Sequence, residues 1–591
     1  MKKTRNRYHY AIRKCKKASD NLKKSKLLNA SRSGKNNIFD EIRKMRNTDE
    51  NIPSIIDGNE NGSERFGEVY KNLYNSTNDT KITKEIFNEV NACISNESLN
   101  YVDLVTSEVI SNVTKDMKSG KNDPIFTFNS DCIKHAPHSL YQHLAWIFKC
   151  FLIHSHVTDF LLVSTIIPRV KDKLGSLESS ENYRSIAFSS AILKIYDWIV
   201  ITLFRNHLVA DELQLGYQKN WSTTMCTWLV VESISYFTRN GNDVFCCFMD
   251  MKKAFDMVEH GMLFRKLLKR NIPLIFIRLL IFIYMSQTAW VKWKGTLSDA
   301  FSIVNGVKQG AVISAILFCI YIDDLMKELR RNRDGCWIND VFVGACVYAD
   351  DVALLSPSID GLQNMIDTCS QFANEHNLKF STHSNPNKSK TKCMVFQHKK
   401  KELRKLKLNG EYLPWVSSVK HLGSTITNNI ECRMTQDLTE KRAAYISKNN
   451  ELLQEFFFAH PSTKIWINNV YNSSFYGSPL WDIHSKEFVK LEKSWNVSQR
   501  MMLNLPRTTH RYFLEPLSKT PHIIKSLKRR FINFIYKIRT SQKDVLRTVL
   551  HEIEHDCRST TGRNIRNLLY ETTSFFFKIS TLILHHRYLK Y

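Results

Sequence analysis

The stretch VFVGACVYADDVALL at residues 341–355 places two adjacent carboxylates between two apolar runs. Apolar runs on both sides of a short polar tip predict a β-hairpin with Asp350 and Asp351 at its turn. Neighbouring carboxylates repel each other beside an apolar core, and a cation between them removes that cost. Hard divalent ions such as Mg²⁺ prefer these oxygen ligands together with substrate phosphates. Taken alone, the pair is equally typical of a solvated turn.

A third carboxylate, Asp250, ends an earlier apolar run, VFCCFM at residues 244–249. A short, continuously apolar run predicts a strand buried on both faces, which would hold an Asp at its end rigidly. One Asp after a buried strand and two at a hairpin tip match the needs of a two-metal phosphoryl transfer. We therefore expect Asp250, Asp350 and Asp351 to be catalytic and to bind two Mg²⁺ ions, with Mn²⁺ as an alternative.

Three motifs around this triad follow one another along the chain. They are DMKKAFD at 250–256, GVKQG at 306–310 with Ser314 and ILF at 316–318, and YADD at 348–351. In their order and separations they resemble motifs A, B and C of reverse transcriptases from non-LTR retrotransposons of the jockey or CR1 kind. One such motif is weak evidence, whereas the ordered set is specific. The other matches are IPRVK at 167–171 and NYRSI at 182–186 (fingers), QLGY at 214–217 with STT at 222–224 (before motif A), Asn387 with KTK at 390–392 (motif D) and HLG at 421–423 (motif E).

This resemblance covers about residues 105–425 and implies an α+β fold shaped as a right hand with fingers, palm and thumb. The palm would be an antiparallel sheet backed by helices, and helical regions would flank it at both ends. We expect a basic helical and linker region over residues 1–100, the fingers and palm over 101–425, and a helical thumb with a basic C-terminal region over 426–591.

The resemblance also implies how a nucleotide would be selected. Phe255, five positions after Asp250, matches the bulky gate that clashes with a ribose 2′-hydroxyl and so selects deoxynucleotides. The alternative for Phe255 is an ordinary core aromatic. Gln309 and Gly310 are predicted in a loop before a helix, where glycine lets the backbone approach the base pair and template.

Three cationic residues receive roles from the same resemblance. Lys171 and Arg184 would pair with triphosphate oxygens, for which Arg offers a planar fork. On the residues alone, each is as well explained as a surface ion pair. Lys390 would protonate the leaving pyrophosphate, with Lys388 and Lys392 as close rivals for that role.

The overall charge favours a polyanionic partner. The net charge is +27 over 591 residues, and the first basic run lies between Lys2 and Lys26. Nucleic acid or an anionic membrane surface would suit such a charge. The N-terminus is not a signal peptide, and the most apolar window, Ile272–Met285, is shorter than a spanning helix and predicts a buried one. We expect an RNA template, a DNA primer or target and dNTPs as partners, no membrane, and a nuclear or cytoplasmic location. No oligomeric state is indicated.

Two alternatives share parts of this pattern. Motif B has Ala311 where relatives often carry Gly, Cys or Ser and Ala315 where they usually carry Pro, and Pro124 stands where Gly is frequent. These departures motivate a catalytically inactive nucleic-acid-binding remnant. An intron maturase or an RNA-dependent RNA polymerase would share the palm chemistry, but Phe255 with the AFD and YADD motifs favours DNA synthesis.

Two further stretches bear on the interpretation. HEIEH at 551–555 fits a zinc-protease pattern, but no third ligand follows at a family spacing, so a solvated helix face is favoured. Residues 1–100 are too short and polar for the endonuclease that many such elements carry ahead of the polymerase. We therefore expect a fragment, a truncated gene copy or a partial reading frame.

Overall fold

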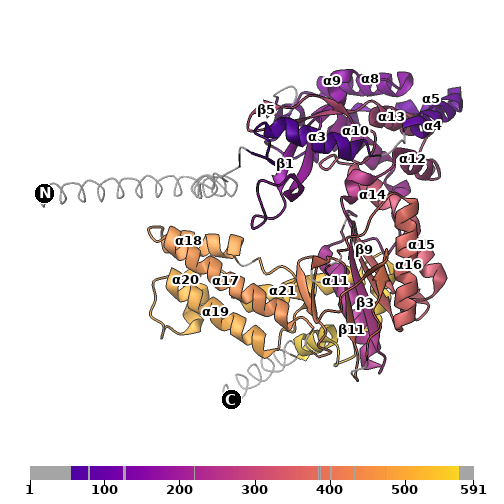
Figure 1. The fold of residues 1–591 in the computed structure, drawn as a ribbon. Helices are drawn as coiled ribbons and strands as arrows, with labels where there is room; N and C mark the ends of the chain where they lie inside the picture. Colours follow the sequence, from indigo (N-terminus) through magenta and orange to yellow (C-terminus); the bar gives the residue numbers. More distant parts are fainter. Residues whose placement is uncertain are drawn as a thin grey trace, which may run out of the picture. The chain divides into compact units, whose positions relative to one another are not determined.

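The computed structural model of the chain describes residues 53–570, apart from residues 54, 77–79, 124–127, 219, 384, 386–387, 400–401, 432 and 473. The basic run from Lys2 to Lys26, Pro124 and Asn387 therefore lie outside the described residues. The described chain forms two compact units (Figure 1). The N-terminal unit comprises residues 53–419 and 543–549, and the C-terminal unit comprises residues 420–542 and 550–570.

The first sheet of the N-terminal unit, which we call the palm sheet, is antiparallel throughout, as predicted. Its order is β11-β3-β10-β9. The bounds are β3 (Val244–Asp250), β9 (Ala345–Tyr348), β10 (Asp351–Ser356) and β11 (Lys392–Phe396). In Figure 1, α11 (Thr223–Arg239) and α16 (Ile359–Glu375) lie on either side of it. This double cover explains why β3 is almost wholly buried and apolar.

The strand predicted over 341–347 is divided in two. β8 (Val341–Phe342) pairs with β7 (Trp337–Ile338), and only β9 joins the palm sheet. The break falls at Gly344, where an added Cβ would lie 2.7 Å from the Cα of Gly335. The missing side chain lets the two backbone segments pack closely, so the chain bends there instead of continuing as one strand.

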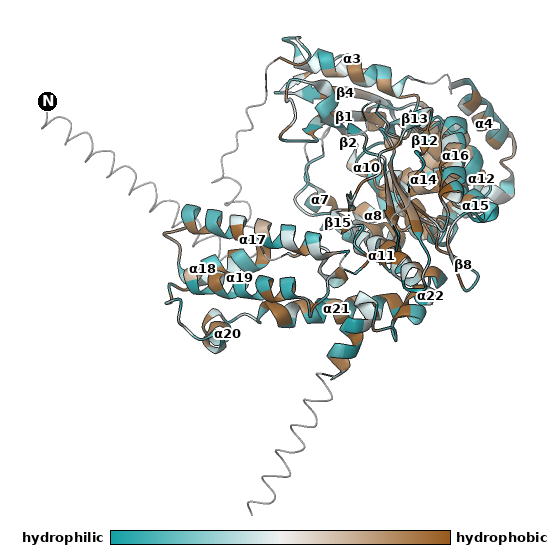
Figure 2. Ribbon diagram, turned by 60° about the horizontal axis from the view of Figure 1, so that its bottom comes forward, coloured by the Kyte–Doolittle hydropathy of each residue, from teal (hydrophilic) through white to brown (hydrophobic). Residues whose placement is uncertain are grey.

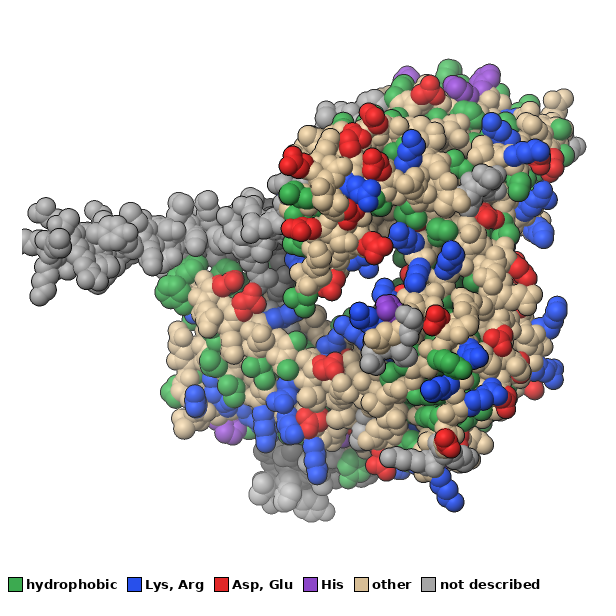
Figure 3. Space-filling model, in the orientation of Figure 1, with side chains coloured by type: hydrophobic (Ala, Val, Ile, Leu, Met, Phe, Trp, Pro, Cys, Tyr) green, Lys and Arg blue, Asp and Glu red, His purple; other side chains and the backbone are tan. Residues whose placement is uncertain are grey.

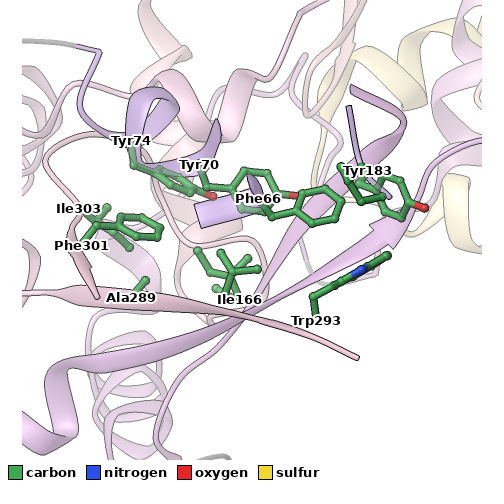
Figure 4. Close-up of a cluster of buried hydrophobic side chains, with 12 residues drawn as sticks. Phe66, Tyr70, Tyr74, Ile166, Tyr183, Ala289, Trp293, Phe301 and Ile303 are labelled. Atoms are coloured by element: carbon green, nitrogen blue, oxygen red, sulfur yellow. The ribbon is translucent and has the colours of Figure 1, made fainter. Parts of the chain in front are cut away.

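A second sheet, which we call the finger sheet, has the order β2-β1-β4-β5, with β6 also paired to β4. Its strands are β1 (Val163–Val170), β2 (Tyr183–Phe188), β4 (Thr288–Trp293), β5 (Thr296–Leu297) and β6 (Phe301–Ser302). Helix α3 (Gly62–Tyr74) packs on it through an aromatic core (Figure 4). The ring of Phe66 lies 4.9 Å from that of Trp293 and 5.1 Å from that of Tyr183. A helix from the segment predicted as a linker region thus forms part of the finger core.

Helices make up most of the rest of the N-terminal unit. They are α4 (Thr80–Ala92), α5 (Asn96–Asn100), α6 (Ser107–Lys115), α7 (Ser130–Lys134), α8 (His138–His154), α9 (Asp159–Leu162), α10 (Ala191–Leu203), α12 (His260–Leu268), α13 (Leu274–Met285), α14 (Ser314–Tyr321) and α15 (Asp323–Asn332). The hairpin β12 (Lys407–Leu408) and β13 (Glu411–Tyr412) completes the unit. α13 is the buried helix predicted for the most apolar window, and its Arg278 donates to the Leu152 and Ile153 carbonyls at 2.7 and 2.8 Å. Within the described part of the chain, no helix combines the length and apolarity needed to cross a membrane.

The C-terminal unit is helical apart from one hairpin, formed by β14 (Ser418–His421) and β15 (Ser424–Thr427). Its helices are α17 (Thr435–Glu455), α18 (Pro461–Ile467), α19 (Lys486–Met502), α20 (Leu514–Ser518), α21 (Ile523–Arg539) and the end of α22 (Asp544–Ile553). Leu438, Tyr445 and Leu452 are buried on one face of α17, as predicted. Figure 2 shows the mixed hydropathy of these amphipathic helices, and Figure 3 shows Lys and Arg side chains gathered over α19.

Candidate active site

The register of the palm sheet brings the three carboxylates of the sequence motifs together. Asp351, the first residue of β10, lies directly opposite Asp250, the last residue of β3. Directly opposed residues of an antiparallel pair have Cβ atoms about 5 Å apart. Asp350 precedes Asp351 in the two-residue turn between β9 and β10, and Ala349 takes a left-handed conformation there, with φ of 58°. The predicted hairpin with acids at its tip is therefore present.

A neighbouring segment braces this turn from behind. The side-chain oxygen of Gln214 accepts hydrogen bonds from the backbone N–H groups of Ala349, at 3.0 Å, and Gly216, at 2.8 Å. The Leu215 N–H donates to the Val347 carbonyl at 2.8 Å. A Cβ on Gly216 would lie 2.5 Å from the Ala349 nitrogen, so only glycine allows this approach. The QLGY motif thus acts as a support for the YADD hairpin, which its place in the sequence did not reveal.

The electrostatics of the triad favour a bound cation. Burial, followed by the charges of Asp350 and Asp250, raises the pKa of Asp351 to about 7. Burial and the charge of Asp250 also raise the pKa of Asp350. The Nζ of Lys390 lies 3.3 Å from the Oδ2 of Asp250 and partly offsets this negative charge. The three carboxylates offer only oxygen ligands, and their mutual repulsion favours protonation. A hard divalent ion bound between them would remove that repulsion.

The described residues contain no group of three or more His, Cys, Asp or Glu side chains arranged to enclose a metal ion. Asp250 and Asp351 are nevertheless opposed on adjacent strands, with Asp350 next to them. The donor chemistry therefore fits a divalent metal, while the coordination of that metal stays a prediction.

Two cationic side chains, Arg184 and Lys390, lie near the triad, and two more, Lys171 and Lys253, lie near Asp256. Burial lowers the pKa of Lys171, and the nearby charges of Lys253, Lys390 and Arg184 lower it further. The charges of Arg184 and Lys390 oppose the rise in the pKa of Asp350. Lys171 and Arg184 extend from the finger strands and are solvent-exposed, and Lys171 Nζ donates to the Glu181 carbonyl at 2.8 Å. Such a group of cations is suited to a polyphosphate.

The sequence motifs contained Lys253 but assigned it no role. It follows β3 in the left-handed region, with φ of 49°, and is exposed. Of the three lysines considered near motif D, only Lys390 forms an ion pair with a triad carboxylate within the described chain. Lys388 is exposed, and Lys392 lies on β11 opposite Phe248. The structure therefore favours Lys390 among the rivals by position.

Asp256, the last residue of motif A, is a buried junction that the motif alone did not indicate. Its Oδ1 accepts hydrogen bonds from the Tyr74 hydroxyl at 2.9 Å, the Ser185 hydroxyl at 3.3 Å and the Gln309 amide at 2.8 Å. Burial raises the pKa of Asp256, and these three donors oppose the rise. The carboxylate thereby ties motifs A and B to the finger sheet and to α3. This role of Asp256 depends on its contact with Tyr74, which is distant in the sequence, and no local sequence pattern predicts that contact.

The motif B loop docks on the finger sheet. The Gln309 carbonyl accepts from the Ala187 N–H at 2.8 Å, and a Cβ on Gly310, whose φ is 129°, would lie 2.5 Å from the Ala187 oxygen. Asp197 of α10 accepts from the Val312 N–H at 3.1 Å and so fixes the end of the loop that precedes α14. The loop before a helix is as predicted. The side chain of Gln309 is engaged by Asp256, however, and its predicted contact with the template stays a prediction.

Phe255 is half-buried beside the triad. Its ring stacks on that of Phe318, with centroids 4.8 Å apart, and meets the ring of Tyr217 edge-on at 6.1 Å. These contacts suit a ring held in a fixed position next to a nucleotide, and they equally suit a packing aromatic. The predicted steric gate therefore stays a prediction.

The two departures in motif B leave the local structure intact. Ala315 is the second residue of α14, a position where its high helix propensity supports the helix without proline. Ala311 closes the loop by donating to the Lys308 carbonyl at 3.3 Å. In the HEIEH stretch, the side chains of His551 and His555 are 80% and 88% exposed, and His555 lies beyond the end of α22. That stretch has the solvated character that the sequence favours.

A central strand ending in Asp and a neighbouring hairpin carrying two more form the kind of carboxylate arrangement that two-metal phosphoryl transfer requires. The comparison with known families is specific: residues 171–426 match the model of the reverse transcriptase (RNA-dependent DNA polymerase) family. The predicted family is thereby confirmed. Reverse transcriptases generally depend on divalent metal.

Three curated relatives illustrate the similarity. The Pol polyprotein of the R2 retrotransposable element of Nasonia vitripennis is 24% identical over 38% of this chain and 21% of its own length. The probable RNA-directed DNA polymerase from transposon BS of Drosophila melanogaster is 23% identical over 56% of this chain and 37% of its own. The RNA-directed DNA polymerase from mobile element jockey of Drosophila funebris is 22% identical over 59% and 38%. The chain thus spans well under half the length of each.

Among solved structures, apo telomerase from Candida tropicalis aligns with 76% of this chain and 74% of its own at 13% identity. The TM-score of 0.36 is below the level that establishes a common fold.

Proposed function

We propose that this chain is the RNA-directed DNA polymerase of a non-LTR retrotransposon, which adds dNTPs to a DNA 3′-end on an RNA template. The observation that carries the proposal is the register of the palm sheet: Asp351 lies opposite Asp250, with Asp350 beside it, inside a domain of the reverse transcriptase family. Three carboxylates on a rigid sheet are the protein's part in an in-line phosphoryl transfer.

The three carboxylates would hold two Mg²⁺ ions, with Mn²⁺ as an alternative. When bound, such ions activate the attacking 3′-oxygen and neutralise the triphosphate and the leaving pyrophosphate. The role of the protein is to keep Asp250, Asp350 and Asp351 in one place. The cross-strand pairing of β3 and β10 and the bonded turn at Ala349 support that role.

The cations would bind the incoming nucleotide. Lys171 and Arg184 reach from the finger strands, and Lys253 and Lys390 from the palm, so that a triphosphate between them would be gripped from two sides. Lys390 would also give a proton to the leaving pyrophosphate. Phe255 would exclude a 2′-hydroxyl, and Gln309 with Gly310 would shape the loop beside the base pair.

The RNA template and the DNA primer or target would be held through their phosphates. Residues 486–540 of the C-terminal unit contain 13 Lys and Arg but only three acidic residues, and Lys486, Lys490 and Lys493 are exposed on α19. Affinity for such a duplex should fall steeply as salt rises, because binding releases counterions. The predicted nuclear or cytoplasmic location and the division at residues 100 and 425 remain part of this proposal.

The proposal is tested by extending a DNA primer on an RNA template. We expect extension with dNTPs and Mg²⁺, and loss of extension in Asp350→Asn. Asp360→Asn is a matched control, because this carboxylate is 74% exposed and pairs with Arg404 on the surface. Tight duplex binding without extension by the unaltered chain would support the inactive remnant instead. Equal use of ribonucleotides would support an RNA polymerase or a maturase-like enzyme.

A further inference from the structure

A short segment from the C-terminal part of the sequence belongs to the N-terminal unit. Residues 543–549 group with residues 53–419, although the residues before and after them belong to the other unit. Val545, Leu546 and Val549 are fully buried. Burial of three aliphatic side chains stabilises the packing of so short a segment on this unit.

Lys543 precedes helix α22 and is itself buried, with 8% of its surface exposed. Its Nζ donates to the backbone carbonyls of Asp211 at 2.9 Å and Gln214 at 3.1 Å. It also lies 5.3 Å from the centroid of the Trp221 ring, in cation–π geometry. Burial lowers the pKa of Lys543 to about 8, while the charges of Asp211 and Glu212 oppose this. A lysine is rarely buried unless its ammonium group is fully bonded.

The carbonyls that Lys543 holds belong to the segment that supports the catalytic turn. Gln214 offers its backbone oxygen to Lys543 and its side-chain oxygen to the N–H of Ala349. Asp211, at the start of the segment, is held on its other side by two hydrogen bonds from Arg330, at 3.0 and 3.1 Å. Two hydrogen bonds, both made through Gln214, therefore connect the Lys543 ammonium to Ala349, the residue before Asp350.

We propose that Lys543 is a positioning residue for the catalytic hairpin, because it fixes Gln214 and through it the turn that carries Asp350 and Asp351. This role adds to the proposed function. Only its expected effect on polymerisation depends on the proposed function being correct. Lys suits the site because its ammonium offers three donors at one point, whereas the fork of Arg spreads its donors in a plane. We therefore expect Lys543, which is distant in the sequence from the three carboxylates, to influence the geometry of the proposed metal ligands.

The test compares Lys543→Met with the unaltered chain. Met keeps the apolar stem and removes the donors. Hydrogen exchange of the peptide that contains Ala349 should become about tenfold faster, since Gln214, which accepts from Ala349, loses the Lys543 donor and keeps only that of Gln218 on its carbonyl. The Kd for Mn²⁺, measured by electron paramagnetic resonance without substrate, should rise about tenfold, as is usual when the support of a metal ligand is lost. On primer and template, kcat should fall about tenfold while the KM for dNTP changes little.

Two further variants make the result decisive. Gln214→Ala removes the second link without touching the lysine, and it should give the same defects. Combined with Lys543→Met it should add little, because both act through one contact. Arg547→Met, an exposed position on α22, should match the unaltered chain. If Lys543→Met does not fold, Gln214→Ala alone decides: normal exchange at Ala349 and a normal Kd for Mn²⁺ would overturn the proposal.

The same measurements separate this inference from the proposed function. Failure of the unaltered chain to extend any primer would contradict the proposed function. The exchange of Ala349 would still report whether Lys543 holds the hairpin. Independent, multiplying effects of Lys543→Met and Gln214→Ala would overturn the positioning role even in an active polymerase.

Discussion

The carboxylates and the cations of the site are built in opposite ways. Asp250 and Asp351 stand at the ends of paired strands, and the turn between β9 and β10 is hydrogen-bonded to Gln214. Lys171, Arg184, Lys253 and Lys390 are exposed side chains, and of these Lys390 rests on Asp250 with 71% of its side chain in solvent. The acids are held by backbone, whereas the cations extend on long, rotatable stems.

This difference indicates which partner each group is matched to. Metal ligands must keep their geometry to within a fraction of an ångström, so a rigid sheet suits them. A triphosphate enters and leaves in every cycle, and mobile cations can follow it. Substitutions among the acids and their supports should therefore act on kcat and metal affinity, and substitutions among the cations on nucleotide handling.

The largest effect is expected at the centre of the rigid group. Asp250→Asn should lower kcat by at least about 1,000-fold, because it removes a charged ligand that Asp351 cannot replace. Single-turnover extension with saturating dNTP measures this loss. Because the amide is isosteric, circular dichroism and the melting temperature should stay near those of the unaltered chain. A loss of less than tenfold would mean that Asp250 is not a metal ligand.

A smaller but still large effect is expected behind the hairpin. Gly216→Ala would bring a Cβ to 2.5 Å from the Ala349 nitrogen, and the backbone must shift to relieve it. We expect kcat to fall about 100-fold, the loss associated with misplacing a catalytic group by about an ångström. Gly241→Ala is the control, because an added Cβ there meets nothing within 4 Å, even though this glycine has a positive φ of 83°. Equal effects of the two substitutions would show that the close approach of Gly216 to Ala349 does not explain the loss.

Lys390→Met should lower kcat by less than substitution of a carboxylate does, which tests the contrast between the carboxylates and the cations. We expect kcat to fall about 10- to 100-fold if Lys390 is the proton donor, in the range of general acid catalysis. Lys388→Met, two positions away and exposed, should remain within about twofold of normal. The check is single-turnover extension by the two variants at one pH with saturating dNTP, which compares their kcat values directly.

The smallest effect expected is on stability without metal. A folded pKa of about 7 for Asp351 lies above the ordinary value of 3.8, so folding favours its protonated form. The melting temperature of the metal-free chain should therefore fall as pH rises from about 4 to 7 and level off above that. Asp351→Asn should lose this part of the pH dependence, and Mg²⁺ should stabilise the unaltered chain more at pH 8 than at pH 5. Identical pH profiles for the two chains would contradict the raised pKa.

Local patterns in the sequence predicted the rigid group well. The apolar run before Asp250 and the two runs around Asp350 and Asp351 specify a buried strand and a hairpin, and antiparallel pairing then places the acids together. The helix stripe of α17 and the buried helix α13 followed from periodicity and length in the same way. Their causes lie within about ten residues, which is the range over which such patterns act.

Contacts between distant segments were not predictable in this way. Tyr74 reaches Asp256 across 182 residues, and Lys543 reaches Gln214 across 329. Neither Tyr74 nor Lys543 belongs to a recognisable motif, because a tyrosine on an amphipathic helix or a lysine before a helix is common. The bend at Gly344 depends on close packing against Gly335. The sequence of a single strand therefore could not predict it.

The packing of α3 on the finger sheet has a practical consequence for any shortened form of the protein. A polypeptide cut to the family match at 171–426 would lack Phe66, Tyr70 and Tyr74, and would leave Trp293 and Tyr183 open to water. It would also leave Asp256 without the hydroxyl of Tyr74. The compact N-terminal unit instead begins at Pro53 and includes residues 543–549. The N-terminal unit is therefore formed by two separate segments of the chain, and no single continuous segment corresponds to it.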